Sequence, residues 1–289
     1  MYYSPLRYPG GKGKLAPFME LMIRKLNLQG GTYIEPFAGG AGIALDLLFN
    51  NLVSHIVIND YDKAVASFWK AVLTDNDRFI DKIYNVPLNI SEWERQKNVV
   101  KLANRYSFEL GFATFYLNRT NRSGIINGGP IGGKQQDGDW KLDARFNREA
   151  LAERVAEIGK RKANISIYNK DVKSLIINYV PKYGKKTLLY FDPPYFEKGK
   201  QLYMNYFSLS DHERIERLIR EHVSCNWMIT YDNAPEIMRI YDGYNVKQYD
   251  LNYSAAKKRV ASELIIFPTN GYCPTNTELE KEDIYINLR

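Results

Sequence analysis

The 289-residue chain contains only two cysteines and three histidines, and all five are widely dispersed. Neither Cys225 and Cys273 nor the histidines show the spacing of a metal site, so we expect no bound metal. So few cysteines are typical of a protein of the reducing cytoplasm. No apolar run reaches the roughly 20 residues of a membrane span, and residues 1–7 lack the apolar core of a secretory signal. We therefore expect no membrane partner.

Acidic residues are in deficit. The net charge is +7 and the sequence pI is about 9.1, which by itself fits any basic globular protein. Together with 22 tyrosines, this balance is compatible with a polyanionic partner whose bases stack on aromatic rings. The length fits one large domain or a domain that carries an insertion.

Strand-like and helix-like segments alternate at both ends of the chain, which predicts an α/β fold. Strands are expected at 32–35, 55–59, 164–168, 187–191 and 226–231, with a closing antiparallel pair at 244–251 and 262–267. Helices are expected at 43–50, 61–74, 107–117 and 147–162, and behind capping-box patterns at 91–94 and 210–213. The glycine- and asparagine-rich segment 118–134 favours turns and a hairpin. We predict a catalytic domain, residues 1–74 and 164–289, split by a mostly helical insert at 75–163.

One motif carries the most chemical information: Asp192-Pro193-Pro194-Tyr195, which follows an apolar strand. Two prolines stop the strand and stiffen the turn. Asp192 and the Pro193 carbonyl can each accept one hydrogen of an exocyclic amine on a planar heterocycle, and Tyr195 can stack on its ring. Taken alone, the motif could equally be an acidic turn, because short motifs need context.

A second motif begins at the end of the strand 32–35. Glu35 is followed by the turn Pro36-Phe37-Ala38-Gly39-Gly40 and a helix, the general geometry of a nucleotide-cofactor site. Asp60, about 20 residues further on, would accept both ribose hydroxyls. The glycines do not follow the dinucleotide pattern. Glu35 would repel a pyrophosphate and suits a cationic ligand, so S-adenosylmethionine, with its sulfonium and ammonium groups, fits better than NAD.

Near the start, the segment 7–15, which contains Gly10, Gly11 and Lys12, is expected to be a compact turn. The glycines would permit close approach of a ligand, and Lys12 could bind the carboxylate of the cofactor. The spacing is not that of a phosphate-binding loop. Taken alone, this segment is more simply explained as a surface turn whose lysines are solvated.

These motifs occur in one order along nearly the whole chain: Tyr8-Pro9-Gly10-Gly11-Lys12, then the segment from Tyr33 to Gly40, then Asp60, then the motif at Asp192. In this order the chain resembles the Dam-type family of adenine-N6 DNA methyltransferases. The resemblance implies a Rossmann-like sheet that binds S-adenosylmethionine, with a recognition insert before the catalytic motif. Tyr8 stands where that family often has tryptophan.

The resemblance also implies residue roles. Tyr8 and Lys12 would contact the cofactor, Glu35 and the turn after it would hold the methionine moiety, and Asp60 the ribose. Asp171, just past the third strand, would bond the cofactor adenine. The target base would lie at the catalytic motif, Asp192 to Tyr195, and Asp192 would also border the cofactor.

DNA contacts are expected in the insert. Asn118-Arg119-Thr120 and the glycine-rich stretch after it resemble the family's DNA-contact region, but they depart from the best-known pattern, so no target sequence is transferred. The expected contact residues are Asn118, Arg119, Asn121, Arg122, Lys134, Lys141 and Arg145, with Lys257 and Lys258 in the closing hairpin loop. For the last pair, a solvated surface is an equally good explanation.

Four alternatives remain open from the residues alone. The same motif could bind the N4 amine of cytosine, or the substrate could be RNA. The chain could also be a non-catalytic nucleic-acid-binding module or a nucleotide-dependent oxidoreductase. The intact Asp192 motif argues against the module, and the absent dinucleotide glycines argue against the oxidoreductase. A partner restriction endonuclease is possible, and the oligomeric state is not indicated.

Overall fold

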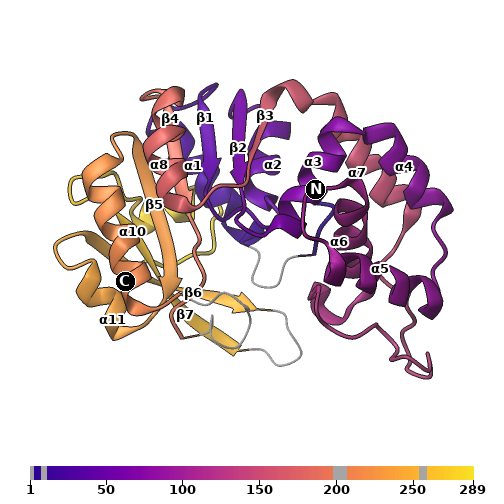
Figure 1. Cartoon of the computed structure of the whole chain (residues 1–289). Coiled ribbons are helices and arrows are strands. Elements are labelled where there is room, and N and C mark those ends of the chain that lie inside the picture. The colour runs from indigo at the N-terminus through magenta and orange to yellow at the C-terminus, as the bar shows by residue number, and fades with distance from the viewer. Residues whose placement is uncertain (1–2, 8–11, 198–206, 254–258) are drawn as a thin grey trace. The chain divides into compact units, whose positions relative to one another are not determined.

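A computed structural model describes residues 3–7, 12–197, 207–253 and 259–289; for 251–253 and 259–261 it describes the backbone alone. The fold is α/β, as the alternation of segments predicted. Its mixed sheet has seven strands in the order β3-β2-β1-β4-β5-β7-β6 (Figure 1). The strands are β1 (Thr32–Glu35), β2 (His55–Asn59), β3 (Ile165–Tyr168), β4 (Thr187–Phe191), β5 (Asn226–Asp232), β6 (Asn245–Tyr253) and β7 (Arg259–Phe267).

The strand directions bring three chain segments to one edge of the sheet. β1 and β5 both run parallel to β4, and β7 runs antiparallel to β5 and to β6. β4 is buried along its whole length, which explains its continuous apolar sequence. The carboxyl ends of β1, β4 and β5 therefore lie at the same edge, and the predicted closing pair is the hairpin β6–β7.

The α-helices are α1 (Ala16–Lys25), α2 (Gly42–Phe49), α3 (Lys63–Thr74), α4 (Asn76–Asn85), α5 (Ile90–Leu102), α6 (Phe108–Thr120), α7 (Arg148–Lys160), α8 (Val172–Asn178), α10 (Leu209–His222), α11 (Pro235–Ile240) and α12 (Asn276–Lys281). Short 3-10 turns occur at η1 (Gly13–Leu15), η2 (Arg122–Gly124), η3 (Lys162–Asn164) and η4 (Val180–Tyr183). Within the described ranges, none of the helices has the length and apolar character that a membrane crossing requires.

The chain divides into two compact units. The first comprises Met1–Gly13, Ala38–Asp46 and Ile58–Asn169, and the second comprises Lys14–Phe37, Leu47–Val57 and Lys170–Arg289. The first unit holds α3 to α7, which gather in one bundle in Figure 1. Its core is aromatic: the ring centroids of Phe79 and Phe112, and of Phe79 and Phe115, lie 5.3 Å apart.

The two predicted capping boxes are misplaced by two residues. The cap of α5 is Asn89, whose side chain accepts the N–H of Glu92 at 2.8 Å. The cap of α10 is Ser208, whose own N–H donates to Asp211 at 2.9 Å. In both cases the pattern matched a serine that already lies inside the helix, Ser91 in α5 and Ser210 in α10, two residues after the true cap.

The prediction of a hairpin in the insert is also wrong, because the segment after α6 forms no paired strands. The segment after α6 has one isolated antiparallel bridge, between Asn121 and Pro130, and turns instead of paired strands. The Asn121 side chain explains this, because it donates to the carbonyls of Ile125 and Ile126, at 2.8 and 2.9 Å. Asn121 therefore organises a closed loop, with its polar group facing inward.

Candidate active site

The Asp192 motif lies at the carboxyl end of β4. Phe191, the last residue of the strand, pairs with Ile229 of β5, so Asp192 follows beside Thr230. Pro193 is buried, and Asp192, Pro194 and Tyr195 are partly exposed. Two consecutive prolines cannot donate to the ladder, so the chain leaves the sheet at this point. The reactive groups thus stand at the sheet edge, where ligands of open α/β sheets bind.

The carboxylate of Asp192 is held by a buried hydroxyl. The Thr230 hydroxyl donates to Asp192 Oδ1 at 3.0 Å, and the Tyr190 hydroxyl lies 2.8 Å from Thr230 Oγ1. Tyr190 of β4 and Asp192, the first residue after the strand, are two positions apart and point to the same side, which lets both reach Thr230. Burial, and then the charge of Asp192, raise the pKa of Tyr190, so its proton stays in place.

The hydroxyl of Tyr195 is bonded to a second buried carboxylate. It donates to Glu263 Oε2 at 2.8 Å, and the Tyr249 hydroxyl donates to the same oxygen at 3.0 Å. Glu263 is fully buried on β7, in register with Tyr249 of β6 and with Asp232 of β5. A buried carboxylate needs such donors, so the tyrosine ring is fixed at its far end.

Asp232 holds the main chain just after the motif. Its two carboxylate oxygens accept the N–H groups of Phe196, at 3.0 Å, and Glu197, at 2.7 Å. Beneath this segment His212 packs edge-on against the ring of Phe196, with the centroids 5.7 Å apart. Burial lowers the pKa of His212 to about 4, so its ring is neutral near pH 7.

The predicted cofactor residue Glu35 ends β1 in the same unit as Asp192, with 6% of its surface exposed. The pKa of Tyr33, two residues earlier on β1, is shifted by the same surroundings. Burial, then the negative charge of Glu35 and that of Asp192, hold the pKa of Tyr33 well above its usual value. The end of this unit's sheet is therefore strongly acidic, which suits a cationic ligand. After the buried Pro36, the ring of Phe37 packs on Phe207 at 5.9 Å.

The rest of the predicted cofactor turn belongs to the first unit. Ala38, Gly39 and Gly40 are buried, and Gly39 has φ +48°, a conformation that favours glycine. The Gly39 carbonyl accepts the indole N–H of Trp69 at 2.9 Å, and the Gly40 carbonyl accepts the Ser4 hydroxyl at 2.5 Å. The turn is thus held by the side chains of Trp69 and Ser4, which no sequence motif had indicated.

Asp60 also lies in the first unit and accepts two backbone N–H groups. Its Oδ2 accepts from Gly39 at 2.9 Å and its Oδ1 from Asp62 at 2.8 Å. Burial raises the pKa of Asp60 to about 7, because it outweighs these two hydrogen bonds. Near neutral pH the side chain therefore exists in both protonation states.

Of the remaining predicted cofactor residues, the structure describes Lys12 and Asp171. Lys12 is described and 7% exposed, in the first unit. Asp171 is exposed in the second unit and caps α8, since its Oδ1 accepts the Ser174 N–H at 3.1 Å. Tyr8, Gly10 and Gly11, like the DNA-binding candidates Lys257 and Lys258, lie outside the described residues.

Three predicted DNA contacts are corrected. Asn118, Arg119 and Asn121 are buried, with 2%, 7% and 0% of their surface exposed. The Asn118 amide bonds both backbone groups of Arg7 at 2.7 Å, and Arg119 donates to the carbonyl of Pro5 at 2.6 Å. These side chains are enclosed and do not form an exposed contact surface here; they frame the loop after α6.

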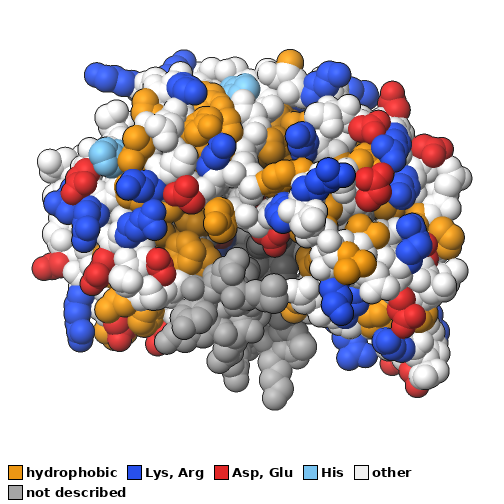
Figure 2. Space-filling model, in the orientation of Figure 1, with side chains coloured by type: hydrophobic (Ala, Val, Ile, Leu, Met, Phe, Trp, Pro, Cys, Tyr) orange, Lys and Arg blue, Asp and Glu red, His pale blue; other side chains and the backbone are white. Residues whose placement is uncertain are grey.

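The other four predicted contacts, Arg122, Lys134, Lys141 and Arg145, are exposed on the loop between α6 and α7. Lys134 pairs with Glu94 at 2.9 Å and Lys141 donates to the Gln136 carbonyl at 2.7 Å. The same loop carries Trp140, which the sequence analysis did not select and which is 70% exposed. On the face shown in Figure 2, basic side chains are spread among acidic ones and form no continuous patch.

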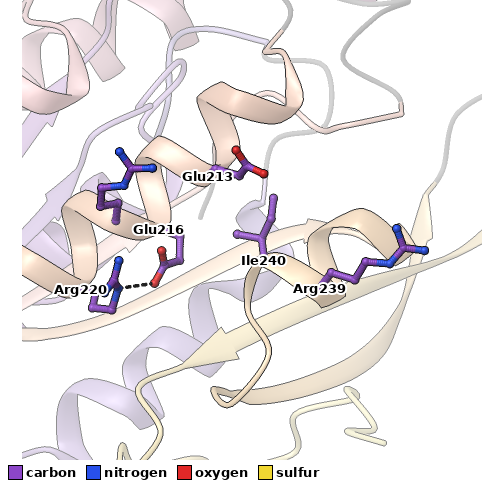
Figure 3. Close-up of a pocket in the computed structure, with 6 residues that line it drawn as sticks. Glu213, Glu216, Arg220, Arg239 and Ile240 are labelled. Carbon is purple, nitrogen blue, oxygen red and sulfur yellow. Dashed lines mark hydrogen bonds and ion pairs between the residues drawn. The ribbon is translucent and has the colours of Figure 1, made fainter.

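A surface depression of about 440 Å³ lies between α10 and α11 in the second unit (Figure 3). Its lining is Glu213, Glu216, Arg217, Arg220, Arg239 and Ile240. Arg220 is bonded to Glu216 at 3.0 Å, so part of this charge is already neutralised. None of these residues belongs to the predicted site, and the depression is shallow and open.

An α/β sheet with Asp-Pro-Pro-Tyr at the carboxyl end of a central strand defines a methyltransferase that acts on an exocyclic amine. Residues 8–255 match the D12 class N6 adenine-specific DNA methyltransferase family. The chain belongs to this family: it methylates the N6 amine of adenine in DNA, with S-adenosylmethionine as its cofactor. The family decides against the cytosine-N4, RNA, oxidoreductase and non-catalytic alternatives.

The chain is 24% identical, over 265 residues, to the Type II methyltransferase M.MjaIII of Methanocaldococcus jannaschii; the match covers 84% of this chain and 89% of the relative. Among solved structures it is similar to a proposed RNA methyltransferase of Pyrococcus horikoshii, with 10% identity and a TM-score of 0.42. The match covers 90% of this chain and 84% of the other. The chain is also similar to TrmK of M. capricolum, solved with S-adenosyl-homocysteine. The identity is 10% and the TM-score is 0.37, and the match covers 92% of this chain and 74% of TrmK. These structural likenesses are too distant to carry an argument, so the assignment rests on the family.

Proposed function

We propose that Asp192 and the Pro193 carbonyl accept the two hydrogens of the adenine N6 amine. The lone pair of this amine is delocalised into the ring, and hydrogen bonds to both hydrogens draw the nitrogen toward a tetrahedral geometry that frees it. The observation that carries the proposal is the Asp192 carboxylate at the end of β4, held by the Thr230 hydroxyl at 3.0 Å. Positive charge grows on the nitrogen as the methyl group arrives, and the carboxylate stabilises it.

The bound cofactor supplies an electrophilic methyl group on a sulfonium. The amine nitrogen would take that methyl group in place of the sulfur, and its surplus proton would leave on the side of Asp192. We assign the cofactor to Tyr8, Gly10, Gly11, Lys12, Glu35, the turn from Pro36 to Gly40, Asp60, Asp171 and Asp192. The donor chemistry fits this ligand, since Glu35 is a buried carboxylate beside a buried tyrosine whose hydroxyl remains protonated.

The ring of Tyr195 would stack on the target adenine. A base inside a duplex cannot reach a sheet-edge site, so we propose that the enzyme acts on double-stranded DNA and flips the adenine out. Stacking offsets part of the few kcal/mol that unstacking costs. The bond from Tyr195 to Glu263 supports this role, because it fixes the plane of the ring before any base arrives.

Sequence recognition belongs, in this proposal, to the insert at 75–163, and the loop between α6 and α7 makes the contacts. Arg122, Lys134, Lys141 and Arg145 would contact phosphates. Trp140 would add an aromatic surface, since a large exposed aromatic on an organised loop is a common contact residue. Lys257 and Lys258, which lie between β6 and β7 in the sequence, would add contacts.

The relative from Methanocaldococcus jannaschii is named a Type II methyltransferase, which supports a role in restriction–modification. We propose that this enzyme is paired with an endonuclease of the same target and works in the cytoplasm. The described cysteines, Cys225 and Cys273, are both free thiols, in keeping with a reducing compartment.

The proposal is tested by transfer of labelled methyl groups to duplex DNA, followed by mapping of N6-methyladenine. Asp192→Ala and Asp192→Asn should lower transfer by at least about a thousandfold and change cofactor affinity less than about threefold. Asp211→Asn, which alters a carboxylate that also accepts a backbone N–H, is the matched control. Near-normal turnover in Asp192→Ala would remove this residue from the mechanism.

A further inference from the structure

Two polar residues of β5 reach the catalytic segment, and neither belongs to the motif. Thr230 and Asp232 are two positions apart, so their side chains stand on the same face of the strand. Thr230 is fully buried and Asp232 is 3% exposed. Thr230 bonds the side chain of Asp192, and Asp232 bonds the backbone of Phe196 and Glu197. β5 therefore holds the catalytic segment by hydrogen bonds on both sides of the two prolines.

The hydroxyl of Thr230 donates one hydrogen bond and accepts another. A threonine hydroxyl has one hydrogen, and it is donated to Asp192 Oδ1 at 3.0 Å. In the contact of 2.8 Å with Tyr190, Thr230 must then be the acceptor and the tyrosine the donor. The result is a one-way relay, from Tyr190 through Thr230 to Asp192, which fixes the rotation of the carboxylate about its own bond.

Asp232 acts on the backbone in the way that a cap acts on a helix. Two successive N–H groups converge on one carboxylate, at 3.0 and 2.7 Å, and such charge-assisted bonds are strong. They set the path of the chain directly after Tyr195. They also lie next to Glu263, the partner of Asp232 across the β5–β7 pair, which receives the Tyr195 hydroxyl.

We propose that Thr230 and Asp232 are positioning residues for methyl transfer: Thr230 orients the Asp192 carboxylate toward the target amine, and Asp232 sets the main chain that carries Tyr195. The inference rests on the proposed role of Asp192. It adds that the accuracy of the site is built into the neighbouring strand, since the prolines themselves offer no N–H by which the sheet could hold them. A misplacement of about 1 Å can cost about a hundredfold in rate.

The test is single-turnover methyl transfer to duplex DNA, with cofactor and DNA affinities measured separately. Thr230→Val, which keeps the shape and removes the hydroxyl, should slow transfer about 10- to 100-fold and change both affinities less than about twofold. Thr230→Ser, which restores the hydroxyl, should return the rate to within about threefold of the wild type. Thr187→Val is the matched control, because Thr187 is equally buried at the start of β4 and its hydroxyl donates to the Tyr183 carbonyl.

Asp232→Asn should also slow transfer about tenfold, since the amide presents one acceptor and one donor to two N–H groups. Tyr190→Phe should slow transfer a few-fold in the wild type and not at all in the Thr230→Val background, because the relay is then already broken. This pair keeps the proposal testable even if one variant is unstable.

The proposal fails if Thr230→Val transfers methyl groups within about threefold of the wild type, or if serine rescues no better than valine. It also fails if the loss is entirely in cofactor or DNA affinity. These outcomes differ from failure of the proposed function, in which Asp192→Ala itself remains active.

Discussion

The bond between Tyr195 and Glu263 gives the sharpest prediction, because two tyrosines donate to the same carboxylate oxygen and only one belongs to the catalytic motif. Tyr195→Phe removes a donor at 2.8 Å, and Tyr249→Phe removes one at 3.0 Å. A hydrogen bond to a charged group contributes about 1.5–3 kcal/mol to stability. Tyr249 is fully buried whereas Tyr195 is partly exposed, so water can replace only the bond from Tyr195.

We therefore expect Tyr249→Phe to lower the free energy of unfolding by about 2 kcal/mol and Tyr195→Phe by about 1 kcal/mol, measured by urea denaturation. Methyl transfer should show the opposite order. Tyr195→Phe frees the ring to tilt and should slow single-turnover transfer about fivefold, whereas Tyr249→Phe leaves the bond to Tyr195 intact and should change it less than about twofold.

Tyr195→Ala removes the stacking surface itself and should slow transfer about a hundredfold. If Tyr195→Phe slows methyl transfer no more than Tyr249→Phe does, the Tyr195 hydroxyl has no specific role in orienting the ring and contributes to stability alone. If Tyr195→Phe is as slow as Tyr195→Ala, the hydroxyl and not the ring face carries the function, and the stacking role is wrong.

Three further predictions follow from the first unit. The pKa of Asp60 is about 7, and two ribose hydroxyls would favour its charged form, so cofactor binding at pH 7 should release about half a proton. The affinity for the cofactor should therefore rise with pH up to about 8. Calorimetry in buffers of different ionisation enthalpy measures the proton release, and the same release in Asp60→Asn would reject the prediction. Replacing Arg122 and Arg145 by Gln should reduce the slope of log affinity for DNA against log salt by about 1.8, and an unchanged slope would show that neither neutralises a phosphate. Exchange of residues 118–145 for the segment of another family member should change the methylated sequence, and an unchanged target would place recognition elsewhere.

The sequence was a good guide to elements with a strong local signal. The β4 strand is an uninterrupted apolar run that ends in two prolines, and the structure buries it completely. Elements without a start signal escaped prediction. The α4 helix follows α3 almost directly, and its cap residue, Asp75, makes no side-chain capping bond. Nothing in the local pattern therefore separates the end of one helix from the start of the next.

Polar residue type was a poor guide to exposure. Asn118 and Arg119 lie in the last turns of α6, near a glycine-rich segment, and their composition favoured a DNA-binding surface. The structure encloses them instead, because the short segment that ends in Arg7 packs against this loop: a Cβ on Gly124 would lie 2.4 Å from the Arg7 carbonyl. The amide of Asn118 satisfies backbone groups there that would otherwise be buried without partners. Such a contact joins residues more than a hundred positions apart, so no local pattern reveals it.

In the catalytic segment, too, the reactive groups are close together in the sequence, whereas the residues that hold them in place are distant. Asp232 and Glu263 stand opposite each other on β5 and β7, and both are almost completely buried. Burying carboxylates is costly unless donors meet them, and the N–H groups of Phe196 and Glu197 and the hydroxyl of Tyr195 are among those donors. The sheet edge is thus stable only when the segment after the prolines is in place, and that segment is ordered only by the sheet edge. Stability of the fold and geometry of the site depend on the same hydrogen bonds, which is why substitutions on β5 and β7 are expected to change the rate of methyl transfer without touching the DNA.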